Sequence, residues 1–230
     1  MQAALEGKIV AVTGGFGVLG RAVAAALEQA GASVALIDRA PAPPELAGRW
    51  PLWGETDLSD RDSARDCLAA ISAQCGGLDG LVNVAGGFVW QTVEDGELAA
   101  WDQMYAMNVR TTLLASQAAL PYLLHRGGRV VNVGALAAAQ AQAGMGAYTA
   151  AKAGVARLTE AMAEEFKDRG VSFNAVLPSI IDTPANRGAM PDADPARWVA
   201  PAALAQVIVF LLSDQAAAIN GALIPVKGRL

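Results

Sequence analysis

Residues 8–20 read KIVAVTGGFGVLG, and this stretch decides the fold. Its first part, Lys8 to Thr13, is a short apolar run rich in β-branched residues, which is typical of a buried parallel strand. Its second part places Gly15, Gly17 and Gly20 in the spacing G-x-G-x-x-G, and an alanine-rich helix follows. A glycine turn between a strand and a helix lets backbone amides approach a pyrophosphate at the helix N-terminus. The stretch therefore predicts a dinucleotide-binding turn, and a tight turn that binds nothing is the less favoured interpretation.

Asp38 closes a second expected strand, 33–38 (SVALID), about 20 residues beyond the glycines. A carboxylate at this place can accept hydrogen bonds from the adenosine ribose hydroxyls, and it would repel the 2′-phosphate of NADP. The neighbouring Arg39 can soften that repulsion. The sequence therefore favours NAD(H) over NADP(H), with a solvated carboxylate at the strand end as the alternative interpretation of Asp38.

The composition limits the classes of function. With 230 residues and 53% hydrophobic residues, the chain suits one α/β domain over 1–230, with a sheet buried on both faces. A net charge of −5 and the lack of a basic stripe argue against a nucleic-acid partner. The longest apolar run, Val207 to Leu212, is far shorter than a membrane span, and Met1–Gly7 lacks the features of a signal peptide. Cys67 and Cys75 are too few for a disulfide framework or a zinc site, so we expect a cytoplasmic protein without a metal.

Strand-like and helix-like segments alternate along the rest of the chain, which favours parallel strands joined by crossover helices. We therefore predict an α/β fold, a single Rossmann-type, doubly wound, mainly parallel seven-stranded sheet with helices on both faces. A segment rich in proline, aspartate and arginine, at about 179–200, is expected to form a substrate loop. The expected strands are 8–13, 33–38, 51–56, 78–85, 130–133, 171–178 and 222–226. The expected helices run from the glycine turn to 30, from 59 to 75, from 97 to 126, around Tyr148, and from 201 to 213.

A tyrosine and a lysine four positions apart form the candidate catalytic pair. The segment 130–152, VVNVGALAAAQAQAGMGAYTAAK, opens with a strand pattern and ends with Tyr148 and Lys152. Positions i and i+4 share one face of a helix, so the ammonium is expected beside the phenol. A nearby cation favours phenolate, which predicts a Tyr148 pKa below its ordinary value of about 10 and proton transfer near neutral pH. Such a pair alone is more often a pair of helix-surface neighbours, and the upstream glycine motif is what gives it weight.

Together these motifs resemble the short-chain dehydrogenase/reductase family over essentially the whole chain. The resemblance implies that Tyr148 and Lys152 are catalytic, and that Asn108 holds a water molecule that connects the lysine to solvent. The family has a serine thirteen residues before the tyrosine, where this chain has Ala135. No serine occurs between Gln117 and Val171, so a shift in register does not supply one.

The resemblance also implies the cofactor contacts. The run 83–86, N-V-A-G, resembles the family's N-N-A-G, where small residues let the backbone pass close to the cofactor ribose, and Asn83 itself is expected to bond neighbouring strands. Asp57 lies where the family contacts adenine, although it can equally cap the next helix. Thr183 matches the threonine that meets the nicotinamide carboxamide. The expected cofactor contacts are Gly14, Gly15, Phe16, Gly17, Val18, Leu19, Gly20, Asp38, Arg39, Asp57, Leu58, Asn83, Ala85, Gly86, Tyr148, Lys152, Pro178 and Thr183.

Within the family, a narrower likeness to the dihydropteridine reductases rests on three segments. Residues 134–138 read G-A-L-A-A, residues 144–148 read G-M-G-A-Y, and residues 182–194 follow the pattern D-T-P-x-N-R-x-x-M-P-x-A-D. The serine is likewise absent from those proteins. The likeness implies hydride transfer to an activated C=N, quinonoid or carbonyl substrate, with Tyr148 as the proton donor. The expected substrate contacts are Phe88, Ala135, Met145 and Trp198.

Two other functions stay open. One is a 3-oxoacyl-type carbonyl reductase or alcohol dehydrogenase that works without the serine. The other is a non-catalytic nucleotide-binding protein, against which the joint presence of Tyr148, Lys152 and Asn108 argues. The helices that carry these residues commonly form a two-fold interface in the family, so a homodimer or homotetramer is expected, with a small-molecule substrate.

Overall fold

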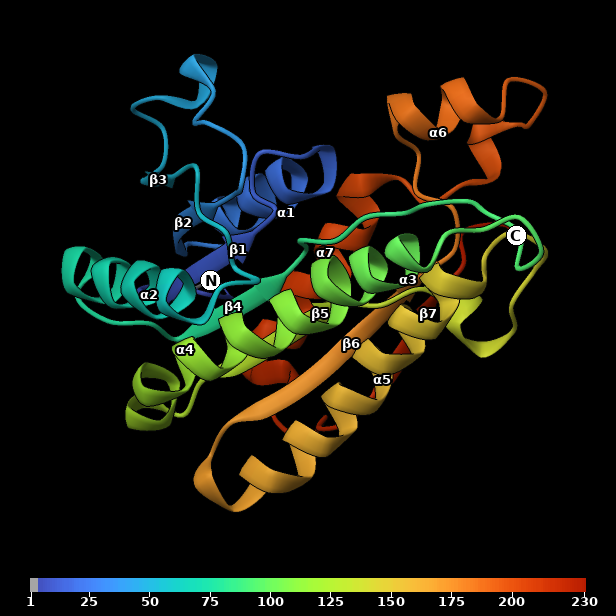
Figure 1. Ribbon diagram of the computed structural model, residues 1–230. Helices are drawn as coiled ribbons and strands as arrows, with labels where there is room; N and C mark the ends of the chain where they lie inside the picture. The colour runs from blue at the N-terminus through green and yellow to red at the C-terminus, as the bar shows by residue number, and fades with distance from the viewer. Residues whose placement is uncertain (1–3) are drawn as a thin grey trace.

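The computed structural model describes residues 4–230, so the first three residues of the Met1–Gly7 segment lie outside it. Seven parallel strands form one sheet in the order β3-β2-β1-β4-β5-β6-β7, with helices on both faces (Figure 1). This is the predicted Rossmann-type, doubly wound architecture. The strands are β1 (Ile9–Thr13), β2 (Ser33–Ile37), β3 (Leu52–Trp53), β4 (Gly80–Asn83), β5 (Arg129–Val133), β6 (Ser172–Pro178) and β7 (Leu223–Val226).

The helices divide between the two faces of the sheet. On one face α1 and α7 pack against each other, and on the other face α2, α4 and α5 cover an apolar layer (Figure 1). Because both faces are covered, every residue of the central strands β1 and β4 is buried. The helices are α1 (Val18–Gln29), α2 (Arg61–Cys75), α3 (Leu98–Met104), α4 (Thr111–Arg126), α5 (Gly146–Phe166), α6 (Pro184–Ala189) and α7 (Pro201–Leu212). None of the described helices combines the length and the apolar character that a bilayer crossing requires.

The strand order reverses at β1, which pairs with β2 on one side and with β4 on the other. Loops that follow two such strands diverge to opposite faces and leave a crevice at the carboxyl edge, where ligands of open α/β sheets bind. The two loops touch here, because a Cβ added at Gly14 would lie 2.8 Å from the backbone nitrogen of Ala85. The fold thus places the glycine turn and the 83–86 run at one point of the sheet edge.

The structure adds local detail to three predictions. The helix expected over 97–126 is interrupted by a π-helical turn, η2 (Tyr105–Arg110), between α3 and α4. The helix expected from 59 begins at Arg61, and its cap is Asp60, which accepts from the backbone nitrogen of Ser63. The expected loop at 179–200 contains the short helix α6 and a single-turn helix, η5 (Pro195–Arg197).

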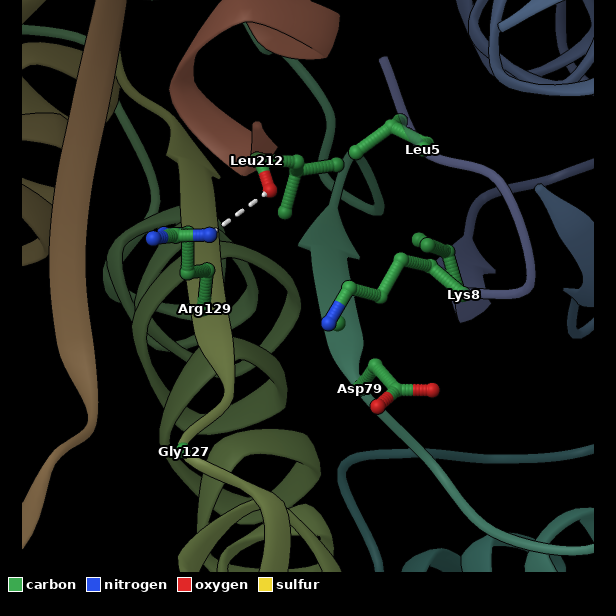
Figure 2. A pocket seen from close by; sticks show the side chains of 8 residues that line it. Leu5, Lys8, Asp79, Gly127, Arg129 and Leu212 are labelled. Atoms are coloured by element: carbon green, nitrogen blue, oxygen red, sulfur yellow. Dashed lines mark hydrogen bonds between the residues drawn. The ribbon is translucent and has the colours of Figure 1, made fainter. Parts of the chain in front are cut away.

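A small cavity lies at the opposite, amino-terminal edge of the sheet (Figure 2). Lys8, Asp79 and Arg129, which begin or precede β1, β4 and β5, line it together with Leu5 and Leu212. Its volume of about 10 Å³ suits one water molecule. The cavity is therefore far too small for a dinucleotide or a substrate, and the carboxyl edge of the sheet is the place for a functional site.

Candidate active site

The glycine turn after β1 leaves the start of α1 open to a ligand. Gly14 has a φ of +63°, and a Cβ added at Gly20 would lie only 2.2 Å from the carbonyl oxygen of Gly14. Gly17 occupies the N-cap of α1, and no side chain of the described residues caps this end. The first amide groups of α1, from Val18 onward, are thus free to donate to an anion. This backbone arrangement fits the pyrophosphate of a dinucleotide.

Asp38 lies directly beside that turn. One carboxylate oxygen accepts from the backbone nitrogen of Phe16 at 3.0 Å, and the other accepts from that of Ala40 at 3.0 Å. These bonds fix the carboxylate, and each oxygen keeps a lone pair for a ribose hydroxyl. Arg39 is exposed at the next position.

The two residues expected near adenine have different surroundings. The Asp57 carboxylate accepts from both the hydroxyl (2.7 Å) and the amide (2.9 Å) of Ser59, which holds the pKa of Asp57 below its ordinary value. Leu58 is buried in the core beneath α2. Asp57 therefore shapes the turn before α2, while Asp60 caps that helix.

Asn83 points into the sheet. Its amide group donates to Ser116 Oγ at 3.0 Å and to Asn132 Oδ1 at 2.9 Å, and Asn132 in turn donates to Thr159 at 2.8 Å. The chain of buried hydrogen bonds crosses from α4 through β4 and β5 to α5. Asn83 is only 2% exposed, so its side chain lies inside the sheet, as expected from the sequence.

Tyr148 and Lys152 share the first turns of α5, yet the pKa prediction for the tyrosine was wrong. Burial raises the pKa of Tyr148 to about 12 and lowers the pKa of Lys152 to about 8. The Lys152 ammonium donates to the carbonyl oxygen of Val133 at 2.8 Å. Desolvation disfavours the phenolate, so the phenol holds its proton throughout the neutral range.

Asn108 lies in the π-helical turn and is fully buried. Its amide nitrogen donates to the carbonyl oxygens of Met104 (2.9 Å) and Gly87 (3.2 Å), and its Oδ1 accepts from the nitrogen of Gly87 at 3.3 Å. The Asn108 side chain thus clamps the loop that follows β4. The expected water-holding role of this side chain stays a prediction, since its amide is committed to the backbone.

Gly86 is where these parts meet. A Cβ added there would lie 2.6 Å from Asn108 Oδ1 and 3.3 Å from Lys152 Nζ. The run 83–86, the π-helical turn and α5 are therefore in close contact. The backbone nitrogen of Ala85, one residue earlier, donates to the Thr13 hydroxyl at 3.1 Å and joins this cluster to β1.

Aromatic side chains form a wall next to the tyrosine. The Phe88 ring meets the Tyr148 ring edge to face, with 5.0 Å between centroids and 82° between planes. The Trp90 ring lies against Gly144, where an added Cβ would come within 2.1 Å of the indole, and the nitrogen of Gln91 donates to the carbonyl of Gly144 at 2.9 Å. Phe88 and Trp90 remain 53% and 61% exposed, so both rings are available to a ligand.

Trp101 is a further part of this wall, since its ring lies 3.3 Å from the position of a Cβ on Gly146. Trp101 was not among the expected contacts, whereas the loop that holds Phe88, Val89 and Trp90 was expected either to wall a planar substrate or to close the core. The available signal was the glycines of the G-M-G-A-Y run, because a residue without a side chain leaves room for a ring.

The other expected residues surround the same edge. Ala135 is buried at the N-cap of η3 (Leu136–Ala139), and Met145 is half-buried just before α5. Thr183 caps α6 by accepting from the nitrogen of Asn186 at 3.2 Å, so its own hydroxyl hydrogen is free to donate. Pro178 ends β6, and Trp198 is only 6% exposed. Among residues 4–230, no three histidine, cysteine or acidic side chains gather as a metal site would need.

The chain is similar to known short-chain dehydrogenases and reductases over nearly its whole length. The family described as short chain dehydrogenase matches residues 8–194. The chain is 36% identical to 2-(S)-hydroxypropyl-CoM dehydrogenase 3 of Xanthobacter autotrophicus, over 99% of this chain and 98% of that protein. It is 34% identical to the 3-oxoacyl-(acyl-carrier-protein) reductase FabG of Vibrio harveyi, over 97% of each chain.

Solved structures share the fold. Carveol dehydrogenase from Mycobacterium avium in complex with NAD superimposes with a TM-score of 0.87, at 24% identity and 98% coverage of both chains. A short-chain type dehydrogenase/reductase from Mycobacterium ulcerans gives a TM-score of 0.90 at 28% identity, covering 98% of this chain and 90% of that one.

Proposed function

This chain belongs to the short-chain dehydrogenase family and is an NAD(P)-dependent oxidoreductase, and we propose that it uses NADH to reduce an activated, planar C=N or quinonoid substrate of the dihydropteridine type. The observation that carries the proposal is the buried methyl group of Ala135 at the position of the family's serine. A ketone reductase must stabilise the charge that grows on oxygen, and losing one oxyanion donor costs on the order of 3–4 kcal/mol. An already activated acceptor takes hydride readily, so Tyr148 can serve as its only acid.

The aromatic wall supports a flat substrate. Phe88 and Trp90 flank the approach to Tyr148 and keep more than half of their surface exposed. Offset or edge-on contacts between aromatic rings contribute roughly 0.5–1.5 kcal/mol beyond their burial. A conjugated ring that packs on the exposed faces of these side chains, beside the tyrosine, would gain such contacts, whereas an aliphatic ketone would not.

The protonation states suit reduction. Bound NADH supplies the hydride, and the residues of this chain supply the proton and the alignment. Tyr148, with a pKa of about 12, is protonated at neutral pH and ready to act as a general acid. Lys152, with a pKa of about 8, is mostly charged there and can bond the nicotinamide ribose while it orients the phenol. Asp38 and the amides of the glycine turn would hold the ribose and the pyrophosphate.

The test of the reaction type is NADH oxidation with quinonoid dihydropterin beside a set of simple ketones, for the wild type and for Tyr148→Phe. The proposal expects turnover of the quinonoid ring that Tyr148→Phe abolishes. Rates equal to those in buffer for both substrate classes would end it.

A second candidate is a 3-oxoacyl-type carbonyl reductase or alcohol dehydrogenase. The names of the two curated relatives, one a reductase of 3-oxoacyl groups and one a dehydrogenase, favour it. The variant that separates the two candidates is Ala135→Ser, because only a ketone reductase gains from a second donor.

Assembly and location belong to the same proposal. Leu98 (74% exposed) and Tyr105 (51% exposed) leave apolar surface on α3 and the π-helical turn, next to the helix that carries Tyr148. We expect this surface to be covered in a homodimer or homotetramer, working in the cytoplasm. Light scattering during size exclusion checks the assembly, and a monomer at micromolar concentration contradicts it.

A further inference from the structure

Two ion pairs tie α1 to the proline-rich segment that follows β2. Near the start of the helix, Arg21 meets Glu45 at 3.1 Å, and near its end Glu28 meets Arg49 at 2.8 Å. Both pairs are solvent-exposed and join the same two segments. Only the first of them continues into the glycine turn, because Arg21 Nε also donates to the carbonyl oxygen of Phe16 at 2.7 Å.

The peptide groups of Phe16 are therefore held from both sides. Its nitrogen donates to Asp38 at 3.0 Å, and its carbonyl accepts from Arg21. A continuous path of hydrogen bonds runs from Asp38 through Phe16 and Arg21 to Glu45. The carboxylate that faces the adenosine ribose in the proposed function is thus connected to a second carboxylate through one residue and one guanidinium.

This arrangement determines what a 2′-phosphate would meet. A guanidinium recognises phosphate best when two of its donors are free to point at it together. Arg21 Nε already donates to the Phe16 carbonyl, and one terminal nitrogen of Arg21 already donates to Glu45. Glu45 stays ionised, since its own backbone amide and then the Arg21 side chain hold its pKa below the ordinary value. Glu45 thus adds negative charge to the network that includes Asp38, and it occupies Arg21, which leaves the exposed Arg39 as the cation next to Asp38.

We propose that Glu45 is a cofactor-specificity residue, which excludes NADP(H) by restraining Arg21 on the Phe16 carbonyl and by adding a second carboxylate beside Asp38. The proposal rests on the proposed function in one respect, namely that the adenosine ribose lies on Asp38. It goes beyond the proposed function because it assigns part of the discrimination between NAD(H) and NADP(H) to a residue outside the glycine turn and outside β2.

The experiment compares Glu45→Gln with Glu28→Gln, which removes the other ion pair between the same segments. Dissociation constants of NADH and NADPH are measured from the fluorescence of the reduced nicotinamide, without substrate, and thermal melting confirms folding. Glu45→Gln should lower the dissociation constant of NADPH by about three- to fivefold relative to that of NADH, as expected for removing one charge that repels a doubly charged phosphate. Glu28→Gln should leave the NADPH/NADH ratio as in the wild type. Adding Arg21→Ala to Glu45→Gln should abolish the gain, and 0.5 M salt should shrink it.

The outcomes separate the two levels of the proposal. If Asp38→Ala relaxes the ratio while Glu45→Gln leaves it unchanged, the role of Glu45 is refuted and the proposed function stands. If neither variant changes the ratio, the placement of the ribose on Asp38 is refuted as well. A wild type that binds neither dinucleotide overturns both, and an equal shift in Glu28→Gln shows a nonspecific effect of surface charge and refutes the specific role of Glu45.

Discussion

Replacing Ala135 with serine puts a hydroxyl where the resemblance implies that the family has one. The variant tests whether the substrate must be activated for Tyr148 alone to reduce it. Ala135 has an extended backbone, with φ −155° and ψ 143°, which serine adopts without strain. Its carbonyl already accepts from the nitrogen of Ala138 at 3.1 Å, so the turn that follows keeps its own hydrogen bond. The change therefore adds a donor without remodelling the loop.

The rate gain that a ketone reductase would show in Ala135→Ser follows from the value of an oxyanion donor. One oxyanion donor is worth roughly 10²–10³ in rate when charge develops on oxygen. Ala135 is 5% exposed, so a hydroxyl without a partner there would cost about 1–3 kcal/mol of stability and lower the melting temperature. We expect a change of less than about threefold in kcat/KM with quinonoid dihydropterin, and no gain with simple ketones, because one acid suffices for an activated ring.

The assay is steady-state NADH oxidation with both substrate classes, alongside thermal melting. Ala139→Ser is the matched control, since it adds the same hydroxyl to the same turn at an exposed position. A gain of about 100-fold or more with simple ketones for Ala135→Ser alone would refute the activated substrate and establish the carbonyl reductase.

Three further predictions concern the same site. Tyr148→Phe should lower kcat by about 10²-fold or more while the dissociation constant of NADH stays near that of the wild type; full turnover would remove the tyrosine from the mechanism. Reduction should slow as pH rises through about 8, where Lys152 loses its charge, and Lys152→Met should lack that step in the pH–rate profile. In the unfolded chain the Lys152 ammonium keeps its ordinary pKa of 10.5, so between about pH 8 and 10.5 the unfolded state binds more protons than the folded state. The contribution of Lys152 to the free energy of unfolding therefore rises with pH in this range, and denaturant titration at several pH values measures it. Gly144→Ala should raise KM for the planar substrate and cost about 1–2 kcal/mol of stability, because the φ of Gly144 is +76° and the added methyl would meet the indole of Trp90. Its control is Gly188→Ala, where an added Cβ meets nothing within 4 Å. Equal effects of the two variants would contradict the reasoning.

The sequence predicted well the features that depend on residues close together in the chain. The alternation of apolar strands with helices predicted the sheet, and the run from Gly14 to Gly20 predicted the tight turn after β1, because glycine spacing reports directly on close backbone contacts. The adjacency of Tyr148 and Lys152 on α5 follows from helical periodicity in the same way.

The features that it missed depend on contacts between distant residues. The pKa of Tyr148 rises because the folded chain buries the phenol, and no local pattern states how deeply a side chain will be buried. The π-helical turn at Asn108 arises where the amide bonds Gly87, twenty-one residues away. The ring of Trp101 packs against Gly146, far along the chain, so this part of the aromatic wall emerges only in three dimensions.

The clamp between Asn108 and Gly87 gives the molecule a mechanical link. The same turn of helix carries Tyr105 on its outer surface and Asn108 on its inner one, and the clamped loop continues into Phe88. Two hydrogen bonds between Asn108 and Gly87 and one peptide link thus connect this turn of helix to the Phe88 ring that touches Tyr148. The apolar surface expected to be covered in an oligomer and the ring beside Tyr148 therefore share one piece of backbone.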